Sequence, residues 1–314
     1  MFKLLPGFYL GWGLGANDAA NVFGPQTHSG IISYRTAVVL TSVFVILGAL
    51  IEGDKGFAHI GNMVAGLTAA QVFIVTLSAA VMMNIMSYAK IPASTSHSIV
   101  GSLIGAGIAF GQEVDYSKIV KSVYCWVITP VGAAVFAFLF YHILSFVWVK
   151  RIKNLFMLSW TIKIFSILFG CYGAYSLGAN NLANVVGIYV HGGMLTGRLG
   201  QILGGAAIAF GVITYSKNVM ATVGSGITTL NPFGALVSVL SGALVLHIFA
   251  KLGVPVSSSQ AVVGAVLGVG IVKGAKTVSY RKLFQIFVGW IATLAGTIVF
   301  SYIMCVLYRK ITGA

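Results

Sequence analysis

Long apolar stretches separated by short polar segments run through the whole chain. Each stretch is close to or longer than the roughly 20 residues that a helix needs to cross about 30 Å of hydrocarbon. Their Leu, Val, Ile and Phe content favours helices over barrel strands, which would alternate polar and apolar residues. The pattern predicts an all-α integral membrane protein, a polytopic helical bundle with segments at 4–33, 36–51, 68–89, 93–111 and 119–148, then at 162–191, 199–216, 229–250, 256–273 and 282–308.

Composition supports a multi-pass protein of the cell membrane, inner or plasma. Hydrophobic residues make up 58% of the chain and charged residues 8%, with a mean hydropathy of +0.96, whereas soluble domains carry about 25% charged residues. The net charge of +14 arises beside only five acids, which indicates basic loops rather than a nucleic-acid partner. Cys125, Cys171 and Cys305 stand singly in apolar segments, so we expect them to pack.

An internal repeat divides the chain. The decapeptide GANDAANVFG begins at Gly15 and recurs as GANNLANVVG from Gly178, 163 residues later. The segment PASTSHSIVGSLIGAG from Pro92 recurs at the same offset as PVSSSQAVVGAVLGVG from Pro255. Such repeats define many transporter folds. They predict a first transmembrane repeat at 1–150, a basic linker at 151–159 and a second transmembrane repeat at 160–314.

The number of crossings decides how the repeats are oriented. An odd number per repeat makes them inverted about an axis in the membrane plane, and an even number makes them parallel. Five segments per repeat predict an inverted repeat. Because a polar segment can enter and leave the membrane on the same side, we also expect discontinuous or re-entrant helices. Basic loops around Arg35, Lys150 and Lys217 favour that side as cytoplasmic, with both termini outside.

The decapeptides predict a cation site. Asp18 lies inside a spanning segment, where an acid is costly unless it faces a polar cavity or a cation. Carboxylate and amide oxygens are hard ligands, and the flanking Gly15 and Gly24 would permit an unwound backbone with free carbonyl groups. Polar glue between helices is the alternative for a single copy. The candidate ligands from both copies are Asp18, Asn17, Asn21, Asn180, Asn181 and Asn184.

The second repeated segment predicts an anion site. Pro92 and Pro255 are expected to open helices, and the hydroxyl groups after them would join free backbone N–H groups at the positive end of each helix dipole. Two opposed helix starts can surround a tetrahedral oxyanion without Arg. Ordinary capping is the alternative for one copy. The candidate ligands are Ser94, Thr95, Ser96, Ser257, Ser258 and Ser259, with Asn21, Asn184 and Gln260.

Residues outside these sets have simpler roles. Glycines at small-xxx-small spacing, such as Gly101 with Gly105 and Gly264 with Gly268, predict close helix packing. His97 would contact the anion, relay protons or pack as a neutral ring. Glu52 resembles a span-end acid and is a candidate gating or accessory cation residue.

These motifs resemble the signature of the inorganic phosphate transporter (PiT) family, in order and over essentially the whole chain. The resemblance implies an ion-coupled phosphate symporter built on an inverted repeat. The motif positions associated with transport are then Asp18, Asn17, Asn21, Asn180 and Asn184. The second decapeptide has Asn181 where many members have Asp, which removes one negative charge and puts the number of bound cations in question.

We therefore expect a secondary active transporter, not an enzyme, that imports inorganic phosphate with sodium by alternating access. Burying phosphate without Arg or Lys in the motifs would be prohibitive unless a cation shared the site. Asn-rich ligation favours sodium; proton coupling, or a permease for sulfate or another tetrahedral oxyanion, are the alternatives. No cofactor is predicted beyond co-transported sodium ions. A homodimer is expected from the many lipid-facing aromatic residues.

Overall fold

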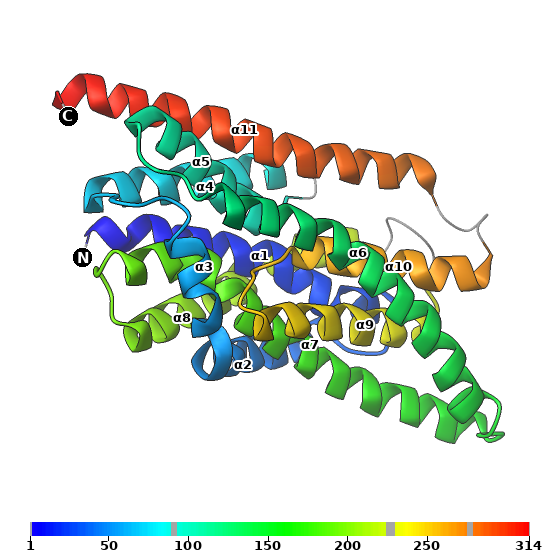
Figure 1. The fold of residues 1–314 in the computed structure, drawn as a ribbon. Coiled ribbons are helices and arrows are strands. Elements are labelled where there is room, and N and C mark those ends of the chain that lie inside the picture. The colour runs from blue at the N-terminus through cyan, green and yellow to red at the C-terminus, as the bar shows by residue number, and fades with distance from the viewer. Residues whose placement is uncertain (1, 89–92, 224–229, 275–278, 314) are drawn as a thin grey trace.

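The computed structural model describes residues 2–88, 93–223, 230–274 and 279–313 and confirms the all-α membrane class (Figure 1). Seven candidate spans, by length and hydropathy, occur among these residues, beside two shorter apolar helices. The elements are η1 (Phe2–Leu4), α1 (Leu5–His28), α2 (Tyr34–Glu52), η2 (Gly53–Gly56), α3 (Phe57–Gly61), α4 (Ala69–Tyr88), α5 (Thr95–Phe110), α6 (Tyr116–Leu144), the π-helical η3 (Ser145–Val149), α7 (Leu155–His191), α8 (Gly197–Val223), α9 (Pro232–Lys251), α10 (Ser258–Lys273) and α11 (Tyr280–Thr312).

Two helical hairpins enter the bundle from opposite ends. Helices α4 and α5 form the first and pack on each other. At its open end the backbone N–H of Asp115, the N-cap of α6, donates to O of Met63, which follows α3 (2.8 Å). Helices α9 and α10 form the second, which opens toward the other end of the molecule (Figure 1). The re-entrant elements are therefore these hairpins. Both termini lie at the end where the first hairpin opens.

The decapeptides do not interrupt their helices, so the expected unwinding is wrong. Helix α1 is continuous from Leu5 to His28 and α7 from Leu155 to His191, and each contains one decapeptide. The glycines serve close approach instead: a Cβ on Gly15 would lie 1.9 Å from Ile208 O, and one on Gly178 would lie 2.1 Å from Val45 O. Here glycine lets two helix backbones touch, as small residues do in membranes.

The two parts of the chain interlock instead of packing side by side. Helix α1 packs on α8 and α7 on α2, while α5 packs on α11 and α10 on α6. A Cβ on Gly105 would lie 2.3 Å from Ile298 O, and one on Gly268 would lie 2.3 Å from Ala134 O. The predicted close packing at these glycines is thus confirmed. Each hairpin is held by the last long helix of the other part.

The buried cysteines behave as predicted. Cys125, Cys171 and Cys305 are all free thiols and all buried. They pack within the apolar interior between the helices.

Gly268→Ala should destabilise the protein, because its new methyl group would collide with the α6 backbone at Ala134. Overpacking of this kind costs about 1–3 kcal/mol. The thermal unfolding midpoint in detergent should fall. Gly132→Ala on α6 is the matched control, since its Cβ meets only Val245 Cγ2 at 3.8 Å. Equal midpoints for the two variants would contradict the packing role of Gly268.

Candidate functional site

The starts of α5 and α10 meet at the centre of the bundle. Ser94 caps α5 by accepting a hydrogen bond from His97 N (3.4 Å), and Ser257 caps α10 by accepting one from Gln260 N (3.4 Å). The hydroxyl of Ser259 donates to Ala93 O (3.4 Å), which joins the two hairpin tips. Two helix N-termini, each with free N–H groups and partial positive charge, therefore converge on one region.

Pro255 lies outside the helix that it was expected to open. Pro255 precedes Ser257, the N-cap of α10, by two residues, so it shapes the approach to the helix and not its first turn. Its counterpart Pro92 lies outside the described residues. Proline before an N-cap favours extended backbone at the preceding residue, and this suits a chain that turns at a hairpin tip.

Asp18 places a carboxylate beside both helix starts. Its side chain is 1% exposed, and Thr95 Oγ1 donates to its Oδ2 (3.4 Å). Ser258 also lies close to this carboxylate, but the position of its hydroxyl group is poor for a hydrogen bond. Oδ1 has no hydrogen-bond partner, and Asp18 forms no ion pair among the described residues. A buried carboxylate so placed needs a cation or a proton.

The second decapeptide reaches the same helix starts from α7. Nδ2 of Asn184 donates to Ser96 Oγ (2.9 Å) and to Asn181 Oδ1 (3.0 Å). These contacts link α7 to α5, the helix whose Thr95 contacts Asp18. Both decapeptides and both hairpin tips therefore build one site, as the repeat predicted.

Several polar atoms of this site are buried without a protein partner. Buried polar atoms are normally hydrogen-bonded, and each one left unpaired costs about 1–3 kcal/mol. Oxygens without a partner can coordinate a cation, while amide and hydroxyl groups without a partner can donate hydrogen bonds to an anion. The unpartnered atoms are Asp18 Oδ1, Asn184 Oδ1 and Gln260 Oε1 among the acceptors, and Asn21 Nδ2, Asn181 Nδ2 and Ser258 Oγ among the groups that can donate.

Two of the predicted cation ligands brace the hairpins. Asn180 donates to Leu246 O on α9 (3.1 Å) and accepts from Val256 N before α10 (3.0 Å), so it ties both arms of the second hairpin to α7. Its equivalent, Asn17, is half-buried and donates to Ser87 Oγ on α4 (2.8 Å). Their sodium-binding role stays a prediction.

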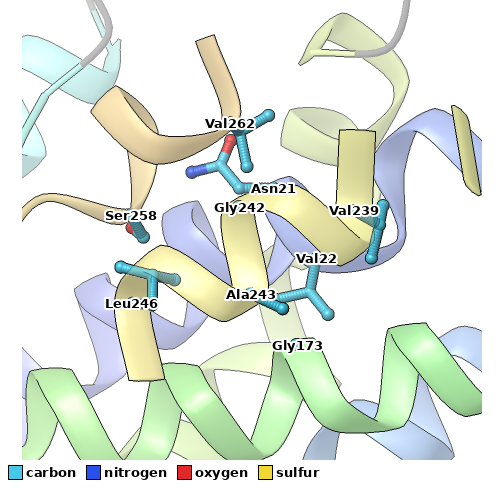
Figure 2. A pocket seen from close by; sticks show the side chains of 9 residues that line it. All are labelled: Asn21, Val22, Gly173, Val239, Gly242, Ala243, Leu246, Ser258 and Val262. Atoms are coloured by element: carbon cyan, nitrogen blue, oxygen red, sulfur yellow. The ribbon is translucent and has the colours of Figure 1, made fainter. Parts of the chain in front are cut away.

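The structure adds α9 to the site, which sequence reasoning missed. A small cavity opens beside Asn21 and Ser258, and its remaining lining is apolar (Figure 2). From α9 come Val239, Gly242, Ala243 and Leu246; Val22, Gly173 and Val262 complete the wall. These residues carry no polar signal, so only their position reveals them.

His97 packs as an aromatic ring. It is buried, its ring centroid lies 4.0 Å from that of Trp126, and its backbone N–H bonds Ser94. Packing was one of the three roles that the sequence left open for it.

The helical fold, with its candidate spans, is that of a multi-pass membrane protein. The sequence profile described as the phosphate transporter family matches residues 14–301. The chain therefore belongs to the phosphate transporter family, and it is a transporter and not an enzyme.

Relatives of similar sequence occur in archaea and bacteria. A protein of Methanocaldococcus jannaschii named "Putative phosphate permease" is 32% identical, with 96% of this chain and 95% of the relative covered. A protein of the same description from Haemophilus influenzae is 26% identical, with 97% and 95% covered. A solved structure described as "The sodium-dependent phosphate transporter" is 23% identical and superposes with a TM-score of 0.89, covering 99% of this chain and all of that one, which establishes the shared fold.

Asn180→Ala should lower the thermal unfolding midpoint in detergent, because it leaves the buried Val256 N without its partner and removes the hydrogen bond to Leu246 O. Losing such bonds costs about 1–3 kcal/mol per orphaned group. Asn17→Ala is the matched control at the equivalent position, where one half-buried hydrogen bond is lost. A loss in Asn17→Ala that equals or exceeds that in Asn180→Ala would contradict the bracing role.

Proposed function

We propose that the protein imports inorganic phosphate with sodium ions by alternating access. The observation that carries this is the unpaired, buried carboxylate of Asp18 beside the starts of α5 and α10. A carboxylate suits a cation, while two helix N-termini suit an oxyanion. Their closeness explains coupling, since each bound ion lowers the cost of burying the other.

Phosphate enters this site as a charged group, and no Lys or Arg contacts Asp18 or its neighbours among the described residues. Its charge must then be balanced by cations bound with it. Oxygens of Asp18 and Asn184 supply sodium ligands, and Ser258 and Asn181 supply donors to phosphate. The printed description of the solved relative, a sodium-dependent transporter, supports sodium over protons as the partner.

The way the hairpins are held supports the proposal of alternating access. They enter from opposite ends and meet tip to tip, through Ser259 and Ala93. An inverted repeat of this kind allows rocking that opens the central site first to one side and then to the other. The repeats 1–150 and 160–314, the external position of both termini and the homodimer belong to this proposal.

Uptake of labelled phosphate into proteoliposomes tests the coupling ion. An inward sodium gradient should drive accumulation, and an inward proton gradient without sodium should not. Uptake driven by external acid in the absence of sodium would replace sodium coupling with proton coupling.

Asp18→Asn should reduce sodium-driven uptake to background, because the site loses its only charged cation ligand. The variant should keep its elution volume on size exclusion, since an amide fills the same space. Glu113→Gln is the control, as it removes one negative charge from an exposed loop position. Full uptake by Asp18→Asn would rule out the central role of this carboxylate.

Sulfate should compete more weakly than unlabelled phosphate at equal concentration. Protonated phosphate can donate a hydrogen bond to the free Oδ1 of Asp18, whereas sulfate has no proton to donate at neutral pH. Equal inhibition by the two anions would favour the general oxyanion permease.

A further inference from the structure

A second polar cluster lies apart from Asp18, around Glu52 at the end of α2. Oε1 of Glu52 accepts a hydrogen bond from Lys251 Nζ (2.7 Å). Oε2 accepts one from Lys55 Nζ (3.3 Å) and lies 3.2 Å from Nε2 of His247. The hydroxyl of Tyr172 lies 2.8 Å from Nδ1 of the same ring and holds it in place. One carboxylate is thus surrounded by three nitrogen groups.

This cluster lies toward the end of a candidate membrane span. Helices α2, η2 and α3 together form that candidate, Tyr34–Gly61, by length and composition, and Glu52 and Lys55 lie in its C-terminal part. Lys251 ends α9, at the tip of the second hairpin. The side chains of Lys251 and Lys55 are 52% and 37% exposed. Ammonium groups are costly in contact with lipid tails, so this surface is expected to face water.

The cluster is directly connected to the central site. His247 follows Leu246, whose carbonyl accepts from Asn180 and whose side chain lines the cavity beside Asn21 and Ser258 (Figure 2). The distance between the two sites is therefore covered by the last turns of α9. A solute that reaches Lys251 from water therefore lies next to the tip of the second hairpin, which in the proposed mechanism moves to open the central site.

We propose that Lys55, His247 and Lys251 form a capture site for inorganic phosphate. The carboxylate of Glu52 occupies this site until phosphate displaces it. The inference rests on the proposed function. The ion pairs of this cluster join two lysines to one glutamate, and the lysine N–H groups already converge on two oxygens. Phosphate presents the same paired oxygens with equal or greater negative charge, so it can replace the carboxylate.

The sequence provides the charged residues of this capture site in one of the two repeat-related positions and not in the other. At the repeat offset of 163 residues, Glu52, His247 and Lys251 correspond to Tyr215, Asn84 and Tyr88, none of them charged. The amide of Asn84 donates to its own helix at Ala80 O (2.8 Å), and the ring of Tyr215 packs 5.5 Å from that of Trp12. The capture site therefore breaks the symmetry of the repeat. In this proposal phosphate is collected on the side of the protein where the capture site lies.

Initial rates of sodium-driven phosphate uptake test this proposal. Lys251→Gln should raise KM for phosphate about tenfold, as expected when a steering charge is lost, and leave Vmax near that of the unmodified protein. Glu52→Gln should lower KM, because it removes the competing carboxylate. Lys251→Arg should keep KM near its original value, and Lys310→Gln, at an exposed position on α11, is the matched control for charge.

A purely structural ion pair makes the opposite prediction for Glu52. If the cluster only fastens the hairpin tip, Glu52→Gln and Lys251→Gln should change KM and Vmax in the same direction, and this result would overturn the capture site. Normal uptake with unchanged KM in Lys251→Gln would also overturn it. If Lys251→Gln does not fold, Lys55→Gln carries the same test. Absence of phosphate uptake by the unmodified protein would instead refute the proposed function.

Discussion

The structure depends on one electrostatic constraint, a carboxylate held in the interior of a membrane protein with no basic partner among the residues that the structure describes. Asp18 can remain there because Thr95 donates to it and the two helix starts surround it with polar groups. Hydrocarbon cannot solvate such a group, so the protein must bring polar atoms from four helices to one place. In the proposed function, the same requirement is what makes the site respond to ions.

Close packing of helix backbones makes that arrangement possible. Gly15 against Ile208, and Gly178 against Val45, bring the decapeptide helices into direct contact with α8 and α2. Gly105 and Gly268 do the same for the hairpins against α11 and α6. Because each contact joins one part of the chain to the other, neither part forms the site by itself. The interlocked fold places the hairpin tips directly against the helices that carry the decapeptides.

Much of the site was accessible from the sequence because the repeat marks it twice. Asp18, Thr95, Ser96, Asn184 and Ser258 were predicted to meet, and the structure places them together. The state of the backbone was harder to predict: glycine in a polar motif suits either unwinding or close packing, and only the neighbouring helix distinguishes these. Asn17 and Asn180 had the same local chemistry as the other amides, yet their nearest atoms belong to hairpins.

The sequence by itself determined the helical membrane class, the repeat and the polar residue types, because hydropathy and internal similarity are properties of the chain read locally. Only the tertiary structure decided which segments become hairpins and which atoms meet. Glu52 and Lys251 are 199 residues apart, and their hydrogen bond depends on where α9 ends relative to α2. Such distances are set by how closely helices cross, and that depends on packing between segments remote in the sequence.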